Sequence, residues 1–149
     1  MVAPQVVVRD VRAVRERAAW ELARDRPLAA IELLEDAVEL APDDAEARML
    51  LGVAYARTRR LEPALGQLER ALLLAPDAFA PRCALGELYL RLGATAQAEE
   101  YLATALARAT DAAERAYVRA LVKSQRARGR RRVRPSFRLP IGGTRGSTT

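Results

Sequence analysis

A cluster of arginines near the C-terminal end is the part of the sequence with the clearest chemistry. Residues 115–149 contain 11 Lys and Arg and no acidic residue. A guanidinium group presents a planar fork of N–H donors, which pairs bidentately with phosphate or carboxylate. The pattern predicts a candidate site for a polyanion, and its residues are Arg126, Arg128, Arg130, Arg131, Arg132 and Arg134.

Three interpretations of this basic stretch are open. It contacts nucleic acid through phosphates, it binds an anionic membrane surface or an acidic protein, or it is a solvated terminus without a dedicated partner. Aromatic residues that would stack on bases are scarce, because Phe137 stands alone. Residues 137–141, with the sequence FRLPI, form a short apolar peptide that we expect to dock on a partner, on a second copy or in a groove of the same chain.

Residues suited to covalent chemistry are scarce. The chain contains no histidine, which removes the commonest general base and the commonest metal ligand. Cys83 is the only cysteine, so no intramolecular disulfide forms, and we interpret it as a small apolar filler. Gly142 and Gly143 lack the preceding strand and following helix of a phosphate-binding loop. The sequence therefore predicts no catalytic residue, no metal site, no cofactor and no enzymatic activity.

The charge of the chain is strongly asymmetric. The formal net charge is +6, yet residues 1–114 carry −5 and residues 115–149 carry +11. The N-terminal residues lack the features of a signal peptide, and no segment approaches the ~18 apolar residues of a membrane span. We therefore expect a cytoplasmic protein without integral membrane association, with a mildly acidic body and a basic end.

An internal repeat organises the first 112 residues. Segments 11–44, 45–78 and 79–112 align at a spacing of 34 without a gap. Small residues share the eighth, twentieth and twenty-seventh columns, where helices can approach closely, and leucine shares the twenty-fourth, where it fills a hairpin core. In column order, the matching residues are Ala18, Gly52 and Gly86; Ala30, Ala64 and Ala98; Leu34, Leu68 and Leu102; and Ala37, Ala71 and Ala105.

This pattern resembles the tetratricopeptide repeat family, and we expect a bacterial source. In the first repeat, Val14, Arg17 and Glu21 replace the Trp, Leu and Tyr that the family favours. The resemblance implies an all-α fold, a right-handed α-solenoid of three tetratricopeptide helix-turn-helix hairpins followed by a capping helix and a flexible basic tail. The second repeat matches the family best, at Leu51, Gly52, Tyr55, Ala64, Leu68, Ala71 and Pro76.

The repeat also sets the expected boundaries. Asp10 is the expected N-cap of the first helix, and the alternative is an earlier start near Pro4. Gly129 is expected to break the last helix, and Trp20 to pack between hairpins. The expected segments are an N-terminal extension or early helix start (1–10), three repeats (11–44, 45–78, 79–112), a capping helix (113–128) and a basic tail that is disordered when free (129–149).

In the family, the first helix of each hairpin lines a concave surface, and the resemblance maps that surface onto this chain. The floor is apolar, with small or flexible side chains such as Met49, Val53 and Cys83, which suits an amphipathic helix or an apolar peptide. The alternative is that these residues are ordinary contacts between neighbouring helices. The peptide-binding candidates are Arg12, Arg15, Ala19, Glu46, Met49, Val53, Ala56, Arg57, Cys83, Glu87, Leu90, Arg91 and Tyr117.

One specialised mode of binding is not expected. Chaperone-binding members of the family grip a terminal carboxylate with a cluster of Lys, Arg and Asn. Only Arg15 remains of that cluster, because Ala19 and Leu50 occupy matching columns. The sequence therefore predicts a protein–protein interaction module, an adaptor or scaffold that binds a peptide or helix of a partner protein. The alternative function is an accessory protein that contacts nucleic acid or another polyanion through the tail.

Overall fold

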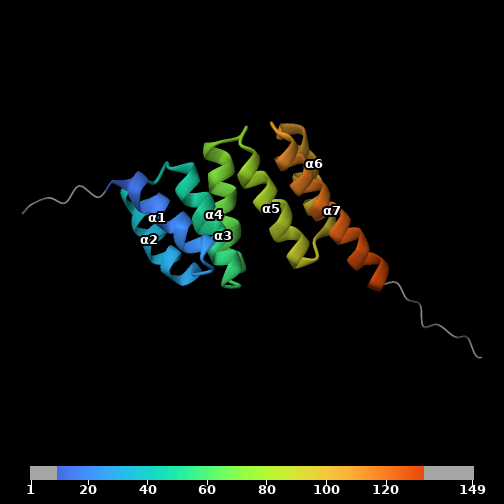
Figure 1. The fold of residues 1–149 in the computed structure, drawn as a ribbon, viewed down its shortest axis with the longest axis horizontal. Coiled ribbons are helices and arrows are strands. Elements are labelled where there is room, and N and C mark those ends of the chain that lie inside the picture. Colours follow the sequence, from blue (N-terminus) through green and yellow to red (C-terminus); the bar gives the residue numbers. More distant parts are fainter. Residues whose placement is uncertain (1–9, 133–149) are drawn as a thin grey trace, which may run out of the picture.

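The computed structural model describes residues 10–132, which form an all-α helical repeat (Figure 1). No strand occurs in this part of the chain, as the sequence predicted. The seven helices within it are α1 (Val11–Ala23), α2 (Pro27–Leu40), α3 (Ala45–Arg57), α4 (Leu61–Leu74), α5 (Phe79–Leu92), α6 (Thr95–Arg108) and α7 (Ala112–Arg132).

Consecutive helices pair as three antiparallel hairpins, and α7 packs on the last of them. The turns within the hairpins, at 24–26, 58–60 and 93–94, all lie on the lower edge in Figure 1. We call this the intra-hairpin edge. The turns between hairpins, at 41–44, 75–78 and 109–111, lie on the opposite edge, which we call the inter-hairpin edge. Because α7 runs in the same direction as α5, its C-terminal end lies on the intra-hairpin edge.

The small-residue columns lie where the two helices of each hairpin are closest. Ala64 and Ala98 of the twentieth column are fully buried, and Leu68 and Leu102 of the twenty-fourth are 1% exposed. A Cβ added at Gly52 would lie 2.6 Å from Leu68 Cγ, and one added at Gly86 would lie 2.6 Å from Leu102 Cδ2. The leucine of the second helix therefore occupies the space that a side chain at the eighth column would need.

The intra-hairpin turns share one backbone geometry. Asp25, Arg59 and Gly93 occupy the same column and all adopt positive φ, at 56°, 61° and 75°. The next residue in each turn donates its N–H to a carbonyl five residues earlier, as Arg60 does to Tyr55 at 2.9 Å. This is the Schellman closure of a helix, for which glycine is favoured. The first hairpin has Asp25 at this position and the second has Arg59. A left-handed conformation costs such a non-glycine residue roughly 1–2 kcal/mol of conformational free energy.

Arginines fasten the inter-hairpin turns, a role that the sequence analysis did not identify. Arg48 Nε donates to the Pro42 carbonyl at 2.6 Å, and Arg82 Nη2 donates to the Pro76 carbonyl at the same distance. Arg115 Nη1 makes the corresponding bond to the Ala109 carbonyl at 3.2 Å. Each arginine follows its acceptor by six residues. The recurring Pro-to-Arg spacing was the available signal.

The sequence correctly predicted where the first helix starts but not where the last helix ends. Asp10 is extended, and its carboxylate accepts from the Arg12 N–H at 3.0 Å, so it is the N-cap of α1. The prediction that Gly129 ends the last helix is wrong, because α7 continues to Arg132. A glycine inside a helix costs only ~1 kcal/mol relative to alanine, and the arginines that flank it favour helix.

The prediction that Trp20 packs between hairpins is also wrong. The side chain is 47% exposed, and the guanidinium groups of Arg17 and Arg24 lie 5.1 and 4.5 Å from its ring centroid. The corresponding residues Ala54 and Leu88 are buried. In the described part of the chain no hairpin precedes α1, so the same column faces outward there.

The close approach at Gly52 can be tested by adding one methyl group. We expect Gly52→Ala to lower the free energy of unfolding by about 1–3 kcal/mol, because the new Cβ would overlap Leu68 in a filled core. Gly66 is the matched control, since it lies inside α4 and a Cβ there meets nothing within 4 Å. Gly66→Ala should raise stability by ~0.5–1 kcal/mol. Urea denaturation measures both, and equal changes would contradict the packing described.

Candidate peptide-binding groove

A cavity of about 290 Å³ opens between α3, α5 and α7. It includes eight of the thirteen candidates from the sequence: Met49, Val53, Ala56, Arg57, Cys83, Glu87, Arg91 and Tyr117. The remaining lining residues are Leu68, Phe79, Ala80, Ala84 and Leu88. We call this cavity the groove. Its lining comes from the second and third hairpins and the capping helix, and the first hairpin does not contribute.

The floor of the groove continues into the hydrophobic core. Leu68 and Leu88 are 1% and 2% exposed and belong to a core cluster against which Met49, Val53 and Ala56 pack. These three residues are only partly buried, so they have one side in the core and another on the groove. The floor residues are therefore contacts between helices, and they also line a hollow.

Phe79 is a lining residue that the sequence analysis missed. It is the first residue of α5, packs against the core cluster that contains Cys83, and closes one end of the groove. Its column holds Val11 and Ala45 in the other repeats, so the repeat pattern gave no signal. The available signal was its size, because it is an aromatic residue at the start of a helix.

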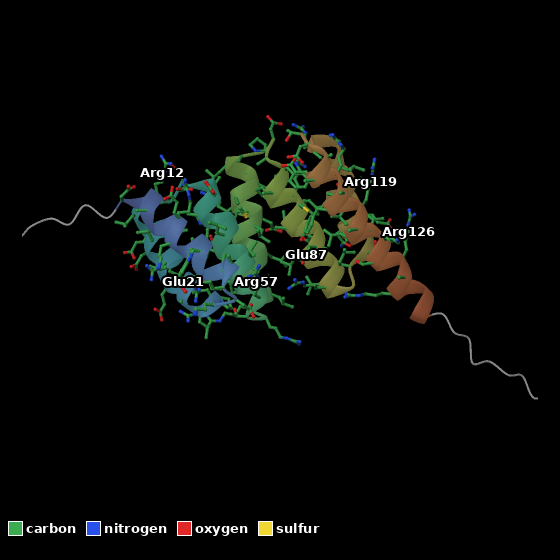
Figure 2. The ribbon with its side chains drawn as sticks, in the orientation of Figure 1. Arg12, Glu21, Arg57, Glu87, Arg119 and Arg126 are labelled. Carbon is green, nitrogen blue, oxygen red and sulfur yellow. The ribbon has the colours of Figure 1, made fainter. Side chains whose placement is uncertain are left out.

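The polar part of the groove is organised around Glu87. Glu87 is labelled in Figure 2. Arg91 Nη2 donates to Glu87 Oε1 at 2.8 Å, and the Tyr117 hydroxyl donates to Glu87 Oε2 at 3.0 Å. Burial and the neighbouring Glu87 carboxylate raise the pKa of Tyr117 to about 12, so its hydroxyl remains a donor at neutral pH. The contact joins α5 to α7. Tyr117 is still 50% exposed, which leaves one face of its ring accessible.

Arg57 forms the rim at the end of α3. Its Nη1 donates to the Leu22 carbonyl at 2.7 Å, which caps the C-terminal turn of α1 from the neighbouring hairpin. Leu22 itself is 5% exposed and lies in the core. Arg57 and Arg91 therefore place two guanidinium groups on the side of the groove that faces the intra-hairpin edge.

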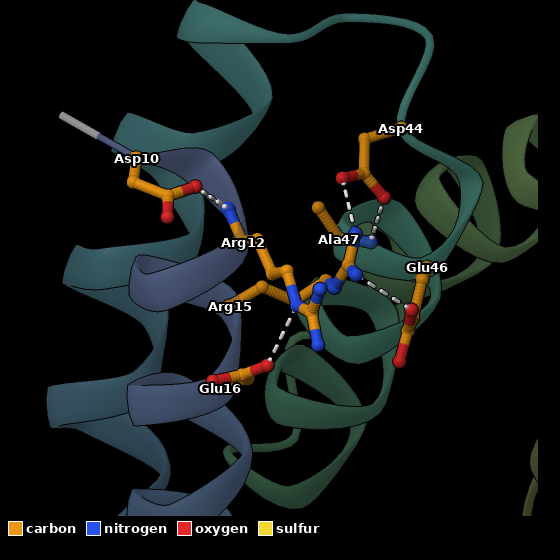
Figure 3. A network of polar contacts seen from close by, with 7 residues as sticks. All are labelled: Asp10, Arg12, Arg15, Glu16, Asp44, Glu46 and Ala47. Atoms are coloured by element: carbon orange, nitrogen blue, oxygen red, sulfur yellow. Dashed lines mark hydrogen bonds and ion pairs between the residues drawn. The ribbon is translucent and has the colours of Figure 1, made fainter. Parts of the chain in front are cut away.

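Three candidates from the sequence, Arg12, Arg15 and Glu46, belong to polar contacts at the other end of the molecule (Figure 3). Arg15 Nη1 lies 2.5 Å from Asp44 Oδ2, and Arg15 Nη2 lies 3.1 Å from Glu46 Oε2. Asp44 also caps α3, since its Oδ1 accepts from the Ala47 N–H at 2.9 Å. Arg12 pairs with Glu16 at 3.0 Å. These contacts fasten α1 to the turn before α3, so Arg15 is occupied by two carboxylates of its own chain.

The remaining candidates lie outside the cavity lining. Ala19 is exposed on α1, and Leu90 packs against the core cluster of Cys83. Arg126 and Arg128 are exposed near the end of α7. Arg130, Arg131 and Arg132 fall in the last turn of that helix, whereas Arg134 and residues 137–141 lie outside the described residues.

Cys83 lies beneath the groove with 4% of its surface exposed. Burial raises the pKa of its thiol to about 11, and the carboxylates of Glu87 and Glu114 act in the same direction. Because the thiolate is the reactive form, this environment suppresses nucleophilic chemistry. Within residues 10–132, no group of three or more Cys, Asp and Glu side chains is placed to hold a metal ion, and no helix is long and apolar enough to cross a bilayer.

Two protein-family models described as tetratricopeptide repeat match the sequence, one over residues 21–78 and one over residues 81–112. No curated protein sequence matches the chain significantly.

Several solved structures share the fold. The type III secretion translocator chaperone SycD of Yersinia enterocolitica has a TM-score of 0.71 and 15% identity, and the match covers 80% of this chain and 93% of that one. MamA of Desulfovibrio magneticus RS-1 has a TM-score of 0.63 and 27% identity over 67% of this chain, which spans 56% of the MamA chain. The second repeat domain of Spaghetti (RPAP3), bound to an HSP90 peptide, has a TM-score of 0.64 and 18% identity, covering 68% and 94%.

The environment of Cys83 predicts slow alkylation. An ordinary thiol has a pKa near 9.0, so a pKa of about 11 leaves roughly a hundredfold less thiolate at pH 8. We expect the native protein to react with iodoacetamide at least that much more slowly than the denatured chain. The native rate should keep rising between pH 9 and about 11, as the thiol ionises. A native rate equal to the denatured rate at pH 8 would show that the thiol is accessible and ordinary.

Proposed function

Since the chain belongs to the tetratricopeptide repeat family, whose members are generally interaction modules, we propose that its groove binds an apolar peptide segment or the apolar face of a helix from a partner protein. The protein would act as an adaptor or scaffold. The observation that carries the proposal is a partly open cavity lined by Met49, Val53, Ala80 and Ala84, where a partner's side chain can replace water.

The size of the cavity favours this kind of occupant. A volume of about 290 Å³ corresponds to on the order of ten water molecules at ~30 Å³ each. Water in an apolar hollow makes few hydrogen bonds, so displacing it by a Leu, Ile or Phe side chain is favourable at ~25 cal/mol per Å² of apolar surface. Met49 adds adaptability, because its unbranched side chain fits several shapes.

The polar groups beside the cavity supply orientation. Glu87, Arg91 and Tyr117 already satisfy one another, so an apolar side chain can enter without leaving a buried charge unpaired. The exposed part of the Tyr117 ring offers a flat surface with a polar tip, as is common at binding interfaces.

The arginine network argues against recognition of a terminal carboxylate. Arg15, the one basic residue left in the carboxylate-gripping columns, is paired with Asp44 and Glu46. Releasing it would break the two ion pairs that join α1 to the start of α3. The peptide-bound RPAP3 domain supports peptide binding on this fold, while the lining here favours an internal apolar segment of the partner over a chain end.

The proposal can be tested with peptides selected by display against the full chain. We expect them to share a bulky apolar residue and to bind almost equally at low and physiological salt. Ala56→Glu with Ala80→Glu places two carboxylates in the lining. Because each would be desolvated by a bound apolar side chain, this double variant should weaken the selected peptides at least about tenfold. Isothermal titration calorimetry measures the affinities.

A matched control uses α6, which does not line the groove. Ala96 lies in the first turn of α6 and Ala107 in its last turn, and both are exposed. Ala80 holds the corresponding position in the first turn of α5, and Ala56 in the last turn of α3. Ala96→Glu with Ala107→Glu therefore adds the same charge at equivalent helix positions, and it should leave peptide affinity within twofold. Equal losses in the two double variants, or no loss in either, would place the binding site elsewhere.

A further inference from the structure

Charge is segregated between the two edges of the repeat. On the intra-hairpin edge, residues 24–26, 57–62 and 91–96 contain six Arg and two acidic residues. On the inter-hairpin edge, residues 39–46, 73–80 and 107–114 contain one Arg and seven acidic residues. The body of the protein is mildly acidic overall, so this basic edge is a property of the fold and cannot be read from the net charge.

The capping helix extends the same edge. Its C-terminal half carries Lys123, Arg126 and Arg128, and no acid follows Glu114 in the described part of the chain. Because α7 runs in the same direction as α5, its basic C-terminal half extends toward the intra-hairpin edge (Figure 1). The start of the Arg-rich C-terminal stretch and the turns of the first two hairpins thus face solvent along one edge.

Most of these cations have no acidic partner. On the intra-hairpin edge Arg26 lies 3.8 Å from Glu21, and Arg91 lies 2.8 Å from Glu87. Arg57 bonds to a carbonyl, and Arg60 lies 6.0 Å from the Tyr55 ring centroid. The exposed cations of this edge without a carboxylate within 4.0 Å, among the described residues, are Arg24, Arg57, Arg59, Arg60, Lys123, Arg126 and Arg128.

The inter-hairpin edge is organised differently. Its arginines are engaged, Arg15 with Asp44 and Glu46, and Arg108 with Asp77. Arg48 and Arg82 donate to turn carbonyls. Uncompensated charge of one sign raises the local concentration of opposite charge and steers its approach. Of the two edges, the intra-hairpin edge has the excess of positive charge, so it is the edge suited to an acidic partner.

The aromatic residues favour a protein partner over nucleic acid. Binding of single-stranded nucleic acid commonly combines cations with exposed aromatic rings on which bases stack. Two aromatic residues among residues 10–132 are about half exposed: Trp20, which already has two guanidinium groups over its ring, and Tyr117, which is bonded to Glu87 in the groove. Arg57 and Arg91, by contrast, belong both to the groove lining and to the edge. A single protein chain can therefore leave the groove and continue along the cations.

We propose that the intra-hairpin edge, from Arg24 to Arg128, binds an acidic segment of a protein, rich in Asp and Glu. Guanidinium groups pair with carboxylates bidentately, and a row of them favours a run of acids over a single one. The edge extends the proposed function, because an acidic segment next to an apolar anchor would engage the edge and the groove together. Binding to the edge alone does not require an occupied groove.

The test is fluorescence anisotropy of a labelled poly-glutamate peptide with the full chain. The triple variant Arg24→Gln, Arg59→Gln and Arg60→Gln removes three edge cations whose guanidinium groups make no ion pair or hydrogen bond. Exposed pairs are individually weak, so we expect this variant to bind about tenfold less tightly, with a shallower salt dependence. Arg12→Gln, Arg70→Gln and Arg108→Gln remove the same charge toward the inter-hairpin edge and should change the affinity less than twofold.

Three results would overturn the proposal. Equal losses in the two triple variants would mean diffuse attraction by net charge. Tighter binding of an oligothymidylate of the same charge, lost in the edge variant, would make the edge a nucleic-acid surface. Unchanged poly-glutamate binding in the edge variant would exclude the edge altogether. Neutral peptides selected on the groove should bind the edge variant normally, so failure of the edge and failure of the groove are read from different ligands.

Discussion

The close approach of the two helices in each hairpin is the constraint on which the other features depend. In the second and third hairpins a leucine of the second helix fills the space over a glycine of the first, Leu68 over Gly52 and Leu102 over Gly86. Alanines of the twentieth column, also fully buried, continue the contact. This packing fixes the separation and direction of α3 and α5. Each of these two helices packs mainly on the second helix of its own hairpin, and the groove opens where α3 and α5 face each other.

The same constraint explains the two edges. Each hairpin closes with the same left-handed turn, at Asp25, Arg59 and Gly93, so the hairpins have equal length and their turns align. The side chains of those turn residues therefore lie along one side of the molecule. Positive charge placed there by separate repeats adds up, whereas several acids at the inter-hairpin turns form helix caps or ion pairs, as Asp44 does.

The sequence predicted the parts that recur. The buried columns and the hairpins could be read from the 34-residue spacing, because each position in a repeat has one environment. The Asp10 cap followed from its residue type, and eight residues of the cavity lining followed from the family resemblance. The prediction that Trp20 is buried between hairpins was wrong because, in the described part of the chain, no hairpin precedes α1 to cover that side chain. The prediction that Gly129 ends the last helix was wrong because a single glycine lowers helix stability without ending a helix whose neighbouring residues favour it.

The repeat pattern could not predict the contacts that side chains make between repeats. Arg15 looked like a free groove residue in the sequence, yet it is held by Asp44 and Glu46 from the next repeat. Arg57 reaches a carbonyl of α1, and Tyr117 joins α7 to Glu87. Such partners depend on how far one hairpin is rotated against another, which spacing within the sequence does not determine. The position of the C-terminal end of α7 relative to the hairpin turns also depends on this rotation, so the repeat pattern could not predict it.

The central claim is that the apolar hollow between α3, α5 and α7 receives a partner's side chain. Methyl NMR of the full chain with a bound peptide tests this directly. The account predicts nuclear Overhauser effects between the peptide's apolar anchor and the methyl groups of Met49 and Val53. Leu73 on α4, which is 74% exposed, provides an apolar reference on another surface. Contacts of the anchor to Leu73, with none to Met49 or Val53, would contradict the account.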